Sequence, residues 1–284
     1  MTKILVTGSS GFIGKHLVPK LIEAGHEVFE VNRLSGEISD ELTWMRFQQA
    51  EVVIHLAGKS FVPDSWSDPA LFMRVNLMGT IAALNYCKRN EARLIYVSSY
   101  LYGNPLFLPI SESSTLVVNN PYALSKKLAE ETCKFYSSNF GIYTTVLRPF
   151  NIYGPGQSDK FLIPSIISQI NSADSVCVRD LQPKRDFVYI HDFVRAIVTA
   201  VNYKEYFKVF NIGSGLSYSV EEVIRAIQAI KGSSLPVYSE NMRRKDEIMN
   251  TVADITEAHL HLGWSPQTSL YQGLEQMLNH VSGF

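Results

Sequence analysis

A glycine-rich segment near residue 10 restricts the fold of this chain more than any other feature of the sequence. Residues 7–14 read Thr-Gly-Ser-Ser-Gly-Phe-Ile-Gly. An apolar run at residues 4–6 precedes the segment, and residues 12–24 follow it with helical periodicity. A glycine turn between a first strand and a first helix lets backbone N–H groups approach a pyrophosphate at the helix N-terminus. The segment therefore predicts a dinucleotide-binding α/β fold.

The rest of the first half alternates short apolar runs with amphipathic stretches. Strands separated by helices form a parallel sheet with helices on both faces. We therefore predict a Rossmann-type, doubly wound domain over residues 1–155. Its further strands are expected at residues 27–32, 52–54, 94–97 and 144–147, and its further helices at residues 69–89 and 122–140.

The pattern loosens beyond residue 155. We interpret residues 156–284 as mainly a smaller α/β substrate lobe. It is interleaved with the first domain, because a return segment near residues 186–215 re-enters that domain. The predicted fold class is α/β, a doubly wound parallel sheet with this smaller C-terminal lobe. Helices are expected near residues 161–170, 192–201, 219–229 and 270–280, and short strands at residues 176–178 and 210–212.

Composition and charge exclude several classes of protein. The formal net charge of -1 gives no general attraction to nucleic acid or to an acidic membrane. No apolar run approaches the length of a membrane-spanning helix, and the first residues do not resemble a signal peptide. The three cysteines are far apart and lack metal-binding spacing. We expect a cytoplasmic, reduced protein that binds no metal, nucleic acid or membrane.

Tyr122 and Lys126 form a pair four residues apart on a predicted helix. Residues at this spacing share a helix face, so the ammonium is expected near the phenol. A nearby cation favours the phenolate and brings the hydroxyl into the acid/base range. The pair is unspecific alone, but Asn120 and Pro121 suit the start of a helix that follows the fourth strand.

The fourth predicted strand ends in a pair of serines, Ser98 and Ser99. Ligands of open α/β sheets bind at the carboxyl ends of the strands. A hydroxyl at this position is expected to reach a substrate oxygen beside Tyr122, although a serine pair also occurs in ordinary strand-end hydrogen bonding.

The motifs together resemble the extended short-chain dehydrogenase/reductases, the NAD-dependent epimerase/dehydratase group. The glycine spacing GxxGxxG is similar to the fingerprint of this family. The resemblance spans nearly the whole chain, and the ordered set is far more specific than any one motif. The matching segments are residues 8–14, 55–58, 98–103, 122–126, 148–155, 185–192, 211–215 and 262–266.

The resemblance implies roles for particular residues. Tyr122 is the acid/base, Lys126 lowers its pKa and holds the nicotinamide ribose, and Ser98 matches the family's catalytic Ser/Thr better than Ser99 does. The other residues that the resemblance implies around the cofactor are Gly8, Ser10, Gly11, Phe12, Ile13, Gly14, Asn32, Arg33, Glu37, Ile38, Leu56, Ala57, Gly58, Asn76, Val97, Pro149, Phe150, Asn151 and Ile152. The residues implied around a nucleotide-diphosphate sugar are Ser60, Ser98, Ser99, Tyr100, Asn151, Arg185 and Arg243, with the two arginines on the diphosphate.

Departures from the family pattern narrow the reaction. Sugar 4,6-dehydratases carry an Asp-Glu pair directly after the catalytic Ser/Thr, where this chain has Ser99 and Tyr100. These side chains do not replace carboxylates, so a dehydratase is disfavoured. The related decarboxylases are disfavoured because they also use a glutamate there.

Two catalytic interpretations and one non-catalytic interpretation remain. The favoured one is an NADPH-dependent reductase of a 4-keto-6-deoxy sugar nucleotide, and the alternative is an NAD-dependent nucleotide-sugar 4-epimerase. A dinucleotide-binding regulator without catalysis is the third. NADP(H) is favoured, with NAD(H) possible in principle, because Asn32 stands where NAD-binding relatives have an acid and Arg33 is suited to a 2′-phosphate.

The resemblance also implies a homodimer. The helices around residues 71–89 and 122–140 resemble those that pair in family dimers as a four-helix bundle. The alternative is that their apolar residues simply face the sheet.

Overall fold

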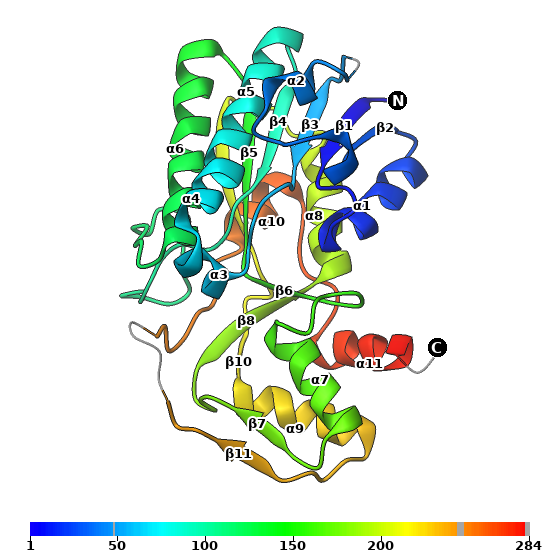
Figure 1. Ribbon diagram of the computed structural model, residues 1–284, viewed down its shortest axis with the longest axis vertical. Helices are drawn as coiled ribbons and strands as arrows, with labels where there is room; N and C mark the ends of the chain where they lie inside the picture. Colours follow the sequence, from blue (N-terminus) through cyan, green and yellow to red (C-terminus); the bar gives the residue numbers. More distant parts are fainter. Residues whose placement is uncertain (48, 243–246, 282–284) are drawn as a thin grey trace.

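Six parallel strands form the central sheet of the larger lobe (Figure 1). The structure is a computed structural model and describes residues 1–47, 49–242 and 247–281. The inner strands are buried on both faces and have largely apolar sequences, whereas the edge strand at residues 27–31 is only partly buried. Their order is β2-β1-β3-β4-β5-β9, with β1 (Lys3–Thr7), β2 (Glu27–Val31), β3 (Val52–His55), β4 (Arg93–Val97), β5 (Thr144–Pro149) and β9 (Phe207–Ile212).

Helices cover both faces of this sheet (Figure 1). On one face α1 packs against α8, and α10 packs against α8 and β9. On the other face α5 packs against α6, with the short α2, α3 and α4 nearby. The bounds are α1 (Phe12–Glu23), α2 (Glu41–Trp44), α3 (Val62–Ser67), α4 (Pro69–Phe72), α5 (Gly79–Asn90), α6 (Pro121–Phe140), α8 (Ile190–Ala200) and α10 (Thr256–Leu262). The predicted α/β class and doubly wound sheet are confirmed.

A smaller lobe lies beyond the carboxyl ends of the main strands (Figure 1). It contains a three-stranded sheet in the order β10-β8-β6 and the parallel pair β11-β7. The chain leaves this lobe through β8, which continues directly into α8, and later returns to it after β9. The lobe consists of β6 (Asn151–Tyr153), α7 (Leu162–Ser172), β7 (Val176–Val178), β8 (Lys184–Tyr189), β10 (Ser217–Ser219), α9 (Val220–Lys231), β11 (Val237–Ser239) and α11 (Leu270–Val281).

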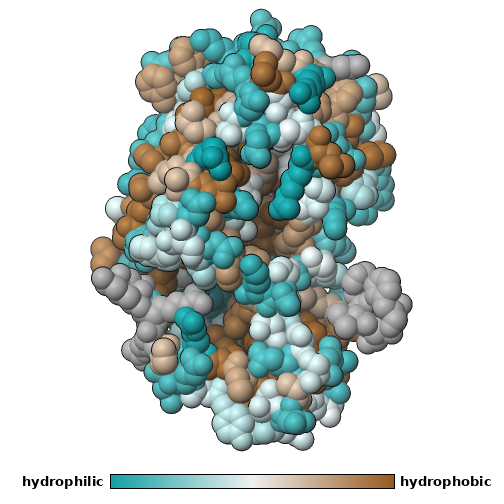
Figure 2. Space-filling model, viewed as in Figure 1, coloured by the Kyte–Doolittle hydropathy of each residue, from teal (hydrophilic) through white to brown (hydrophobic). Residues whose placement is uncertain are grey.

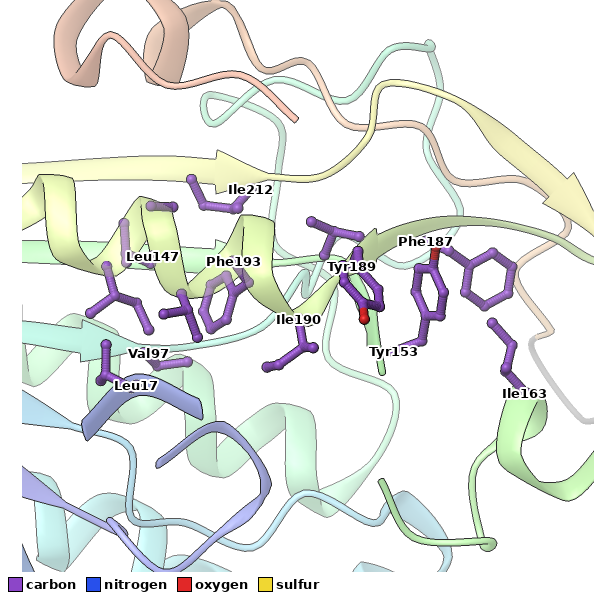
Figure 3. Close-up of a cluster of buried hydrophobic side chains, with 14 of the residues drawn as sticks. Leu17, Val97, Leu147, Tyr153, Ile163, Phe187, Tyr189, Ile190, Phe193 and Ile212 are labelled. Atoms are coloured by element: carbon purple, nitrogen blue, oxygen red, sulfur yellow. The ribbon is translucent and has the colours of Figure 1, made fainter. Parts of the chain in front are cut away.

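One hydrophobic cluster runs from the larger lobe into the smaller one (Figure 3). Leu17 and Leu147 represent the larger lobe, whereas Tyr153, Phe187 and Ile163 represent the smaller lobe. All five side chains are buried. Because buried interiors are close-packed, a continuous core holds the two lobes in a defined relation.

The direction of strand addition reverses between β1 and β3. From β1 the chain adds β2 on one side and β3, β4 and β5 on the other. At such a reversal the connecting loops diverge and leave a crevice at the carboxyl ends of the strands. In the space-filling view a recess lies between the two lobes (Figure 2). Among the described residues, no helix has both the length and the apolar character that crossing a bilayer requires.

Candidate active site

The turn between β1 and α1 holds glycines where side chains do not fit. Gly8 has a φ of 70°, and a Cβ there would lie 2.9 Å from the Ala57 nitrogen. A Cβ at Gly14 would lie 2.4 Å from the Ser9 carbonyl oxygen. Gly8 therefore lies against the segment that follows β3, and Gly14 lies against the backbone of the turn itself.

The N-terminus of α1 is suited to an anion. Gly11 is the N-cap residue and contributes no side-chain hydrogen bond, so the N–H groups of the first turn, which begins at Phe12 and Ile13, have no side-chain cap. Ser10 and Gly11 are exposed. Free N–H groups and the helix dipole favour a phosphate here. The residues present therefore fit the pyrophosphate of a dinucleotide.

A hydrogen-bonded set ties β1 to β3 beneath this turn. The Thr7 hydroxyl accepts a hydrogen bond from the Ala57 N–H at 3.1 Å and lies 2.8 Å from His55 Nδ1. Burial lowers the pKa of His55 to about 3, so the imidazole is neutral. His55 therefore holds the segment that leads to Leu56 and Gly58 in place and is not an acid/base group.

Asn76 fixes the next part of the cofactor loop. Its Oδ1 accepts from the Lys59 N–H at 2.8 Å, and its Nδ2 donates to the Lys59 carbonyl at 3.1 Å and to Ser125 Oγ at 2.9 Å. A Cβ at Gly58 would lie 3.0 Å from Asn76 Oδ1 and 3.5 Å from Lys126 Nζ. The structure thus brings Gly58, Asn76 and Lys126 together. Asn76 lies in the π-helical turn η2 (Met73–Met78).

The predicted Tyr122–Lys126 pair lies at the start of α6. Asn120 caps this helix by accepting from the Ala123 N–H at 2.8 Å. Lys126 Nζ donates to the Val97 carbonyl at the end of β4, at 2.9 Å. Burial raises the pKa of Tyr122 to about 12 and lowers the pKa of Lys126 to about 8. In the protein alone the phenol is therefore protonated, and the cation is easily neutralised.

The two serines after β4 have different surroundings. A hydrogen bond from Ser99 acts on the Tyr122 phenol and opposes the rise of its pKa. The Ser98 hydroxyl is buried and has no hydrogen-bond partner among the described residues. A buried hydroxyl without a partner costs about 1–3 kcal/mol, which a substrate hydroxyl or carbonyl would offset. Ser98 remains the predicted substrate-facing residue, while Ser99 is the one that reaches Tyr122.

Tyr100 occupies the position at which dehydratases of the family have a carboxylate. Its ring stacks on Phe150, with centroids 4.9 Å apart. Its hydroxyl donates to Asn151 Oδ1 at 3.1 Å, and Asn151 Nδ2 donates to the Asp186 carbonyl at 3.0 Å. The contacts of Tyr100 and Asn151 join the end of β4 to β6 and β8 of the smaller lobe. Pro149 is buried at the end of β5, and Ile152 is partly buried on β6.

Residues predicted near the adenine and its ribose lie at the end of β2. Arg33 and Glu37 are exposed, while Asn32 is partly buried and caps the next turn by accepting from the Leu34 N–H at 2.9 Å. Ile38 packs on Gly79 at the start of α5, where a Cβ would lie 3.0 Å from Ile38 Cγ2. Ser60, predicted for the substrate, is exposed.

Arg185 lies on β8 and is engaged within the smaller lobe. Its guanidinium donates to the carbonyls of Lys184 and Ile248 and forms an ion pair with Glu247. Arginine has five N–H donors, so two remain for a ligand after these three bonds. Arg243, the other arginine predicted for the diphosphate, lies outside the described residues.

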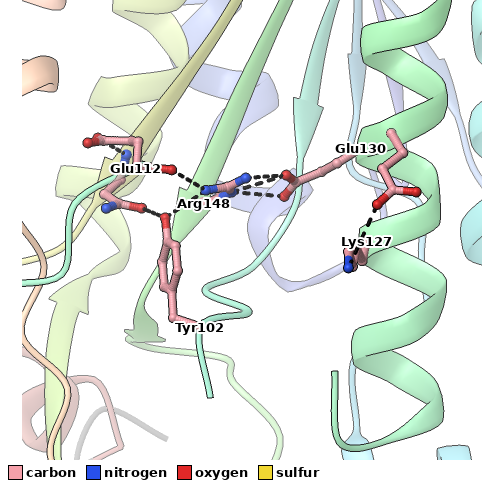
Figure 4. Close-up of polar contacts among 7 residues, drawn as sticks. Tyr102, Glu112, Lys127, Glu130 and Arg148 are labelled. Atoms are coloured by element: carbon pink, nitrogen blue, oxygen red, sulfur yellow. Dashed lines mark hydrogen bonds and ion pairs between the residues drawn. The ribbon is translucent and has the colours of Figure 1, made fainter. Parts of the chain in front are cut away.

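A buried network of polar side chains joins α6 to β5, and the sequence did not predict it (Figure 4). Arg148 Nε lies 3.1 Å from both carboxylate oxygens of Glu130, and Arg148 Nη2 lies 2.6 Å from Oε2. Arg148 also donates to Tyr102 Oη at 2.8 Å and to the Glu112 carbonyl at 3.2 Å. The available signal was the helix register, because Glu130 lies four residues after Lys126 on α6.

The lobes also touch at the edge of the cofactor loop. Phe61 meets Phe161 edge-on, with centroids 5.9 Å apart. Lys160 Nζ lies 5.1 Å from the Phe61 ring centroid and 3.9 Å from Asp64 Oδ2. Phe61 and Asp64 come from the larger lobe, whereas Lys160 and Phe161 precede α7 of the smaller lobe. The segment that begins at Phe61 therefore contacts the opposite lobe, whereas Lys59 and Ser60 before it are exposed.

Comparisons with known proteins agree with this geometry. Residues 4–213 match the NAD dependent epimerase/dehydratase family. GDP-6-deoxy-D-mannose reductase of Pseudomonas aeruginosa is 32% identical over an alignment 300 residues long. The alignment covers 98% of this chain and 96% of that protein. RMD from Pseudomonas aeruginosa, solved in complex with NADPH, superposes with a TM-score of 0.91 at 30% identity, over 99% of this chain and 98% of that one.

A second solved structure is equally similar. UDP-glucose 4-epimerase of Thermotoga maritima, solved with UDP-glucose, has a TM-score of 0.92 at 29% identity, over 99% of this chain and 98% of that one. The chain belongs to the NAD-dependent epimerase/dehydratase family. It is an NAD(P)-dependent enzyme of the short-chain dehydrogenase/reductase type and uses a nicotinamide dinucleotide. The family predicted from the sequence is confirmed, and the non-catalytic regulator has no support.

Proposed function

We propose that this enzyme reduces a 4-keto-6-deoxy sugar carried by a nucleotide diphosphate, with NADPH as the reductant. The observation that carries the proposal is the end of β2, where Asn32 replaces an acid and Arg33 is exposed beside it. A carboxylate there would repel a 2′-phosphate, and a guanidinium attracts one. Similarity to a GDP-6-deoxy-D-mannose reductase, and to a structure solved with NADPH, supports the same interpretation.

Within this proposal Tyr122 donates the proton that the new hydroxyl requires. The bound nicotinamide supplies the hydride, and the Tyr122 phenol gives its proton to the oxygen of the ketone. The high pKa of Tyr122 keeps the phenol protonated before the reaction. The Lys126 ammonium, held by the Val97 carbonyl, stabilises the phenolate that remains. Ser98 donates a hydrogen bond to the substrate oxygen, and Ser99 orients the phenol.

On the substrate side, Arg185 binds the diphosphate with the donors left free by Glu247 and the two carbonyls. We expect Arg185→Ala to raise KM for the nucleotide sugar with less effect on binding of the nicotinamide cofactor. If nucleoside diphosphates bind the variant as tightly as the wild type, the diphosphate site lies elsewhere. We propose the same role for Arg243.

A nucleotide-sugar 4-epimerase with bound NAD is the second candidate. It would use the same serine, tyrosine and lysine, and the Thermotoga maritima epimerase supports it. Net cofactor turnover separates the two. A reductase consumes NADPH in proportion to a 4-keto-6-deoxy nucleotide sugar, whereas an epimerase interconverts UDP-glucose and UDP-galactose without added cofactor. Interconversion without NADPH consumption would overturn the reductase proposal.

Tyr122→Phe tests the catalytic assignment. Removing a positioned acid typically costs about 10²–10⁴-fold in rate. We expect turnover to fall by at least this much while the dinucleotide dissociation constant stays near the wild-type value, because the glycine turn is untouched. Wild-type turnover in the purified variant would refute the role of Tyr122.

A further inference from the structure

The end of β2 is followed by a tight turn that presents a free hydroxyl. This turn, η1 (Arg33–Ser35), is held at its start by Asn32, whose Oδ1 accepts from the Leu34 N–H at 2.9 Å. Ser35 Oγ accepts from the Asn32 N–H at 3.2 Å. A serine hydroxyl has one proton to donate in addition to its acceptor lone pairs. Ser35 therefore keeps a donor for a ligand, whereas the Asn32 carbonyl is already occupied.

A second arginine reaches the same turn from a different element. Arg46 follows α2, and its Nη1 donates to the Ser35 carbonyl at 3.4 Å. Arg33 and Arg46 are both exposed. Over the part of the chain that the structure describes, no ion pair with a carboxylate is found for either guanidinium. Two unpaired cations that share one turn favour an anion between them.

The backbone at Gly36 lets α2 and the residue Arg46 after it come close to the turn η1. Gly36 has a φ of 123°, and a Cβ there would lie 2.5 Å from Thr43 Oγ1 on α2. Thr43 is buried, and Arg46 follows it by three residues. Of the acids in this segment, Asp40 is engaged as the N-cap of α2, where it accepts from the Leu42 N–H at 3.0 Å, Glu41 lies 3.5 Å from Arg89, and Glu37 is exposed. The turn and α2 are therefore packed together with the arginines outward.

We propose that Arg46 and Ser35, together with Arg33, form the site for the 2′-phosphate of NADPH, with Arg46 as a second specificity-determining arginine. The inference rests on the proposed use of NADPH and deepens it. A phosphate monoester carries up to two negative charges near neutral pH and three acceptor oxygens. Two guanidiniums and one hydroxyl match that set, whereas the 2′-hydroxyl of NADH makes little use of it. Arg46 lies 13 residues beyond Arg33 and outside the glycine-loop motif.

The test is binding of dinucleotides to the protein without substrate. Wild type, Arg33→Ala, Arg46→Ala and Ser35→Ala are titrated with NADPH, NADH, 2′-AMP and 5′-AMP by calorimetry. A charge-assisted hydrogen bond is worth about ten- to a hundred-fold in affinity. We expect Arg46→Ala to weaken NADPH and 2′-AMP by about ten-fold or more and to leave NADH within about two-fold. Ser35→Ala should weaken NADPH by a smaller factor.

Arg89→Ala is the matched control. Arg89 is a partly exposed arginine whose guanidinium lies 3.5 Å from Glu41 of α2, so its loss removes one positive charge from the same region. It should leave NADPH binding near the wild-type value. If Arg33→Ala abolishes the NADPH preference but Arg46→Ala behaves like Arg89→Ala, the inference about Arg46 is wrong and the proposed cofactor stands. If wild type binds NADPH no more tightly than NADH, the NADPH proposal fails and this inference fails with it.

Discussion

Burial acts in opposite directions on the two titrating groups of the active site. It raises the pKa of the Tyr122 phenol to about 12 and lowers the pKa of the Lys126 ammonium to about 8. Both shifts have the same cause, because an apolar surrounding disfavours whichever form is charged. The protein alone is therefore set to give a proton from Tyr122, provided that Lys126 is still charged when the phenolate forms.

We expect activity to fall as the pH rises through about 8. Lys126 is charged below its folded pKa of about 8 and neutral above it. Loss of this charge removes the group that stabilises the phenolate, so kcat/KM should decline on the alkaline side with an apparent pKa near 8. A profile of kcat/KM against pH measures this decline.

Stability should change in the other direction over the same range. The folded pKa of Lys126 is about 8 and its ordinary value is 10.5, so the native state releases this proton first. Between these two pH values the unfolded state binds more protons, and the Lys126 contribution to stability rises with pH. Other groups add to the total, so Lys126→Met is the reference for this contribution. An alkaline loss of activity that follows global unfolding, or a flat profile up to about pH 10, would argue against Lys126.

At the residue scale, the sequence predicted those relations in which both residues belong to one short motif. Tyr122 and Lys126 share one helix face, and their relation follows from helical spacing. The contact between Ser99 and Tyr122 depends on how the loop after β4 turns, which no local pattern specifies. The pairing of Arg185 with Glu247 joins residues 62 positions apart and also carries no local signal.

At the scale of elements, the buried ion pair between α6 and β5 holds the catalytic helix on the sheet. Glu130 and Arg148 are 5% and 7% exposed, and Lys126 lies one turn before Glu130. Removing one partner of such a pair leaves an uncompensated buried charge. We expect Glu130→Gln to lower the free energy of unfolding by about 3–5 kcal/mol in chemical denaturation.

An exposed pair on α1 offers a control for this prediction. Glu23 lies 2.6 Å from Lys20, so Glu23→Gln should cost about 0–1 kcal/mol. Adding Arg148→Met to Glu130→Gln should recover part of the loss, because it removes the unpaired cation. Equal effects of Glu130→Gln and Glu23→Gln would show that the buried pair does not anchor α6.

Most long elements were predicted and most three-residue strands were not. The strand expected at residues 176–178 is β7, whereas the six-residue strand β8 was not predicted. The strands expected at residues 52–54, 94–97 and 144–147 correspond to β3, β4 and β5, and the predicted helix at 122–140 corresponds to α6. β6, β10 and β11 have three residues each, too few to show a period of two. Their pairing depends on partners far along the chain, as β6 with β8 shows. The predicted helix over residues 69–89 is interrupted by the π-helical turn that contains Asn76.

At the scale of the whole molecule, the two lobes share one core and meet across the site. The core extends from Leu17 on α1 to Ile163 on α7, and Phe61 of the larger lobe contacts Phe161 of the smaller lobe. The sequence predicted two interleaved parts but not the hydrophobic core that they share. The apolar face of an amphipathic helix shows that the helix is packed, but not which surface it packs on. The relation of the lobes is a property of packing between distant segments.

The remaining prediction concerns assembly, and it rests on the outer surface of α5 and α6. The inner faces of these helices bury Cys87 and Cys133 in the cluster beneath the sheet. Their outer faces, with Leu77 of the preceding turn η2, form a groove whose lining includes Ile81, Leu128 and Phe135, and Phe135 is 56% exposed. Exposed apolar surface of this kind is typical of a protein interface. We expect a homodimer in which α5 and α6 of each copy form a four-helix bundle.

Phe135→Glu tests this assembly, since it would place a carboxylate of each copy in the contact, where burial of an unpaired charge costs several kcal/mol. Light scattering at micromolar concentration should give the mass of a dimer for the wild type and of a monomer for Phe135→Glu. Leu106→Glu is the control, because Leu106 is 91% exposed in the loop after β4 and does not line this groove, so the dimer should stay intact. If Phe135→Glu binds the dinucleotide with the same dissociation constant as the wild type, the monomer is folded. If the wild type is itself monomeric, or if Phe135→Glu remains dimeric, the outer face of α5 and α6 is not the dimer interface.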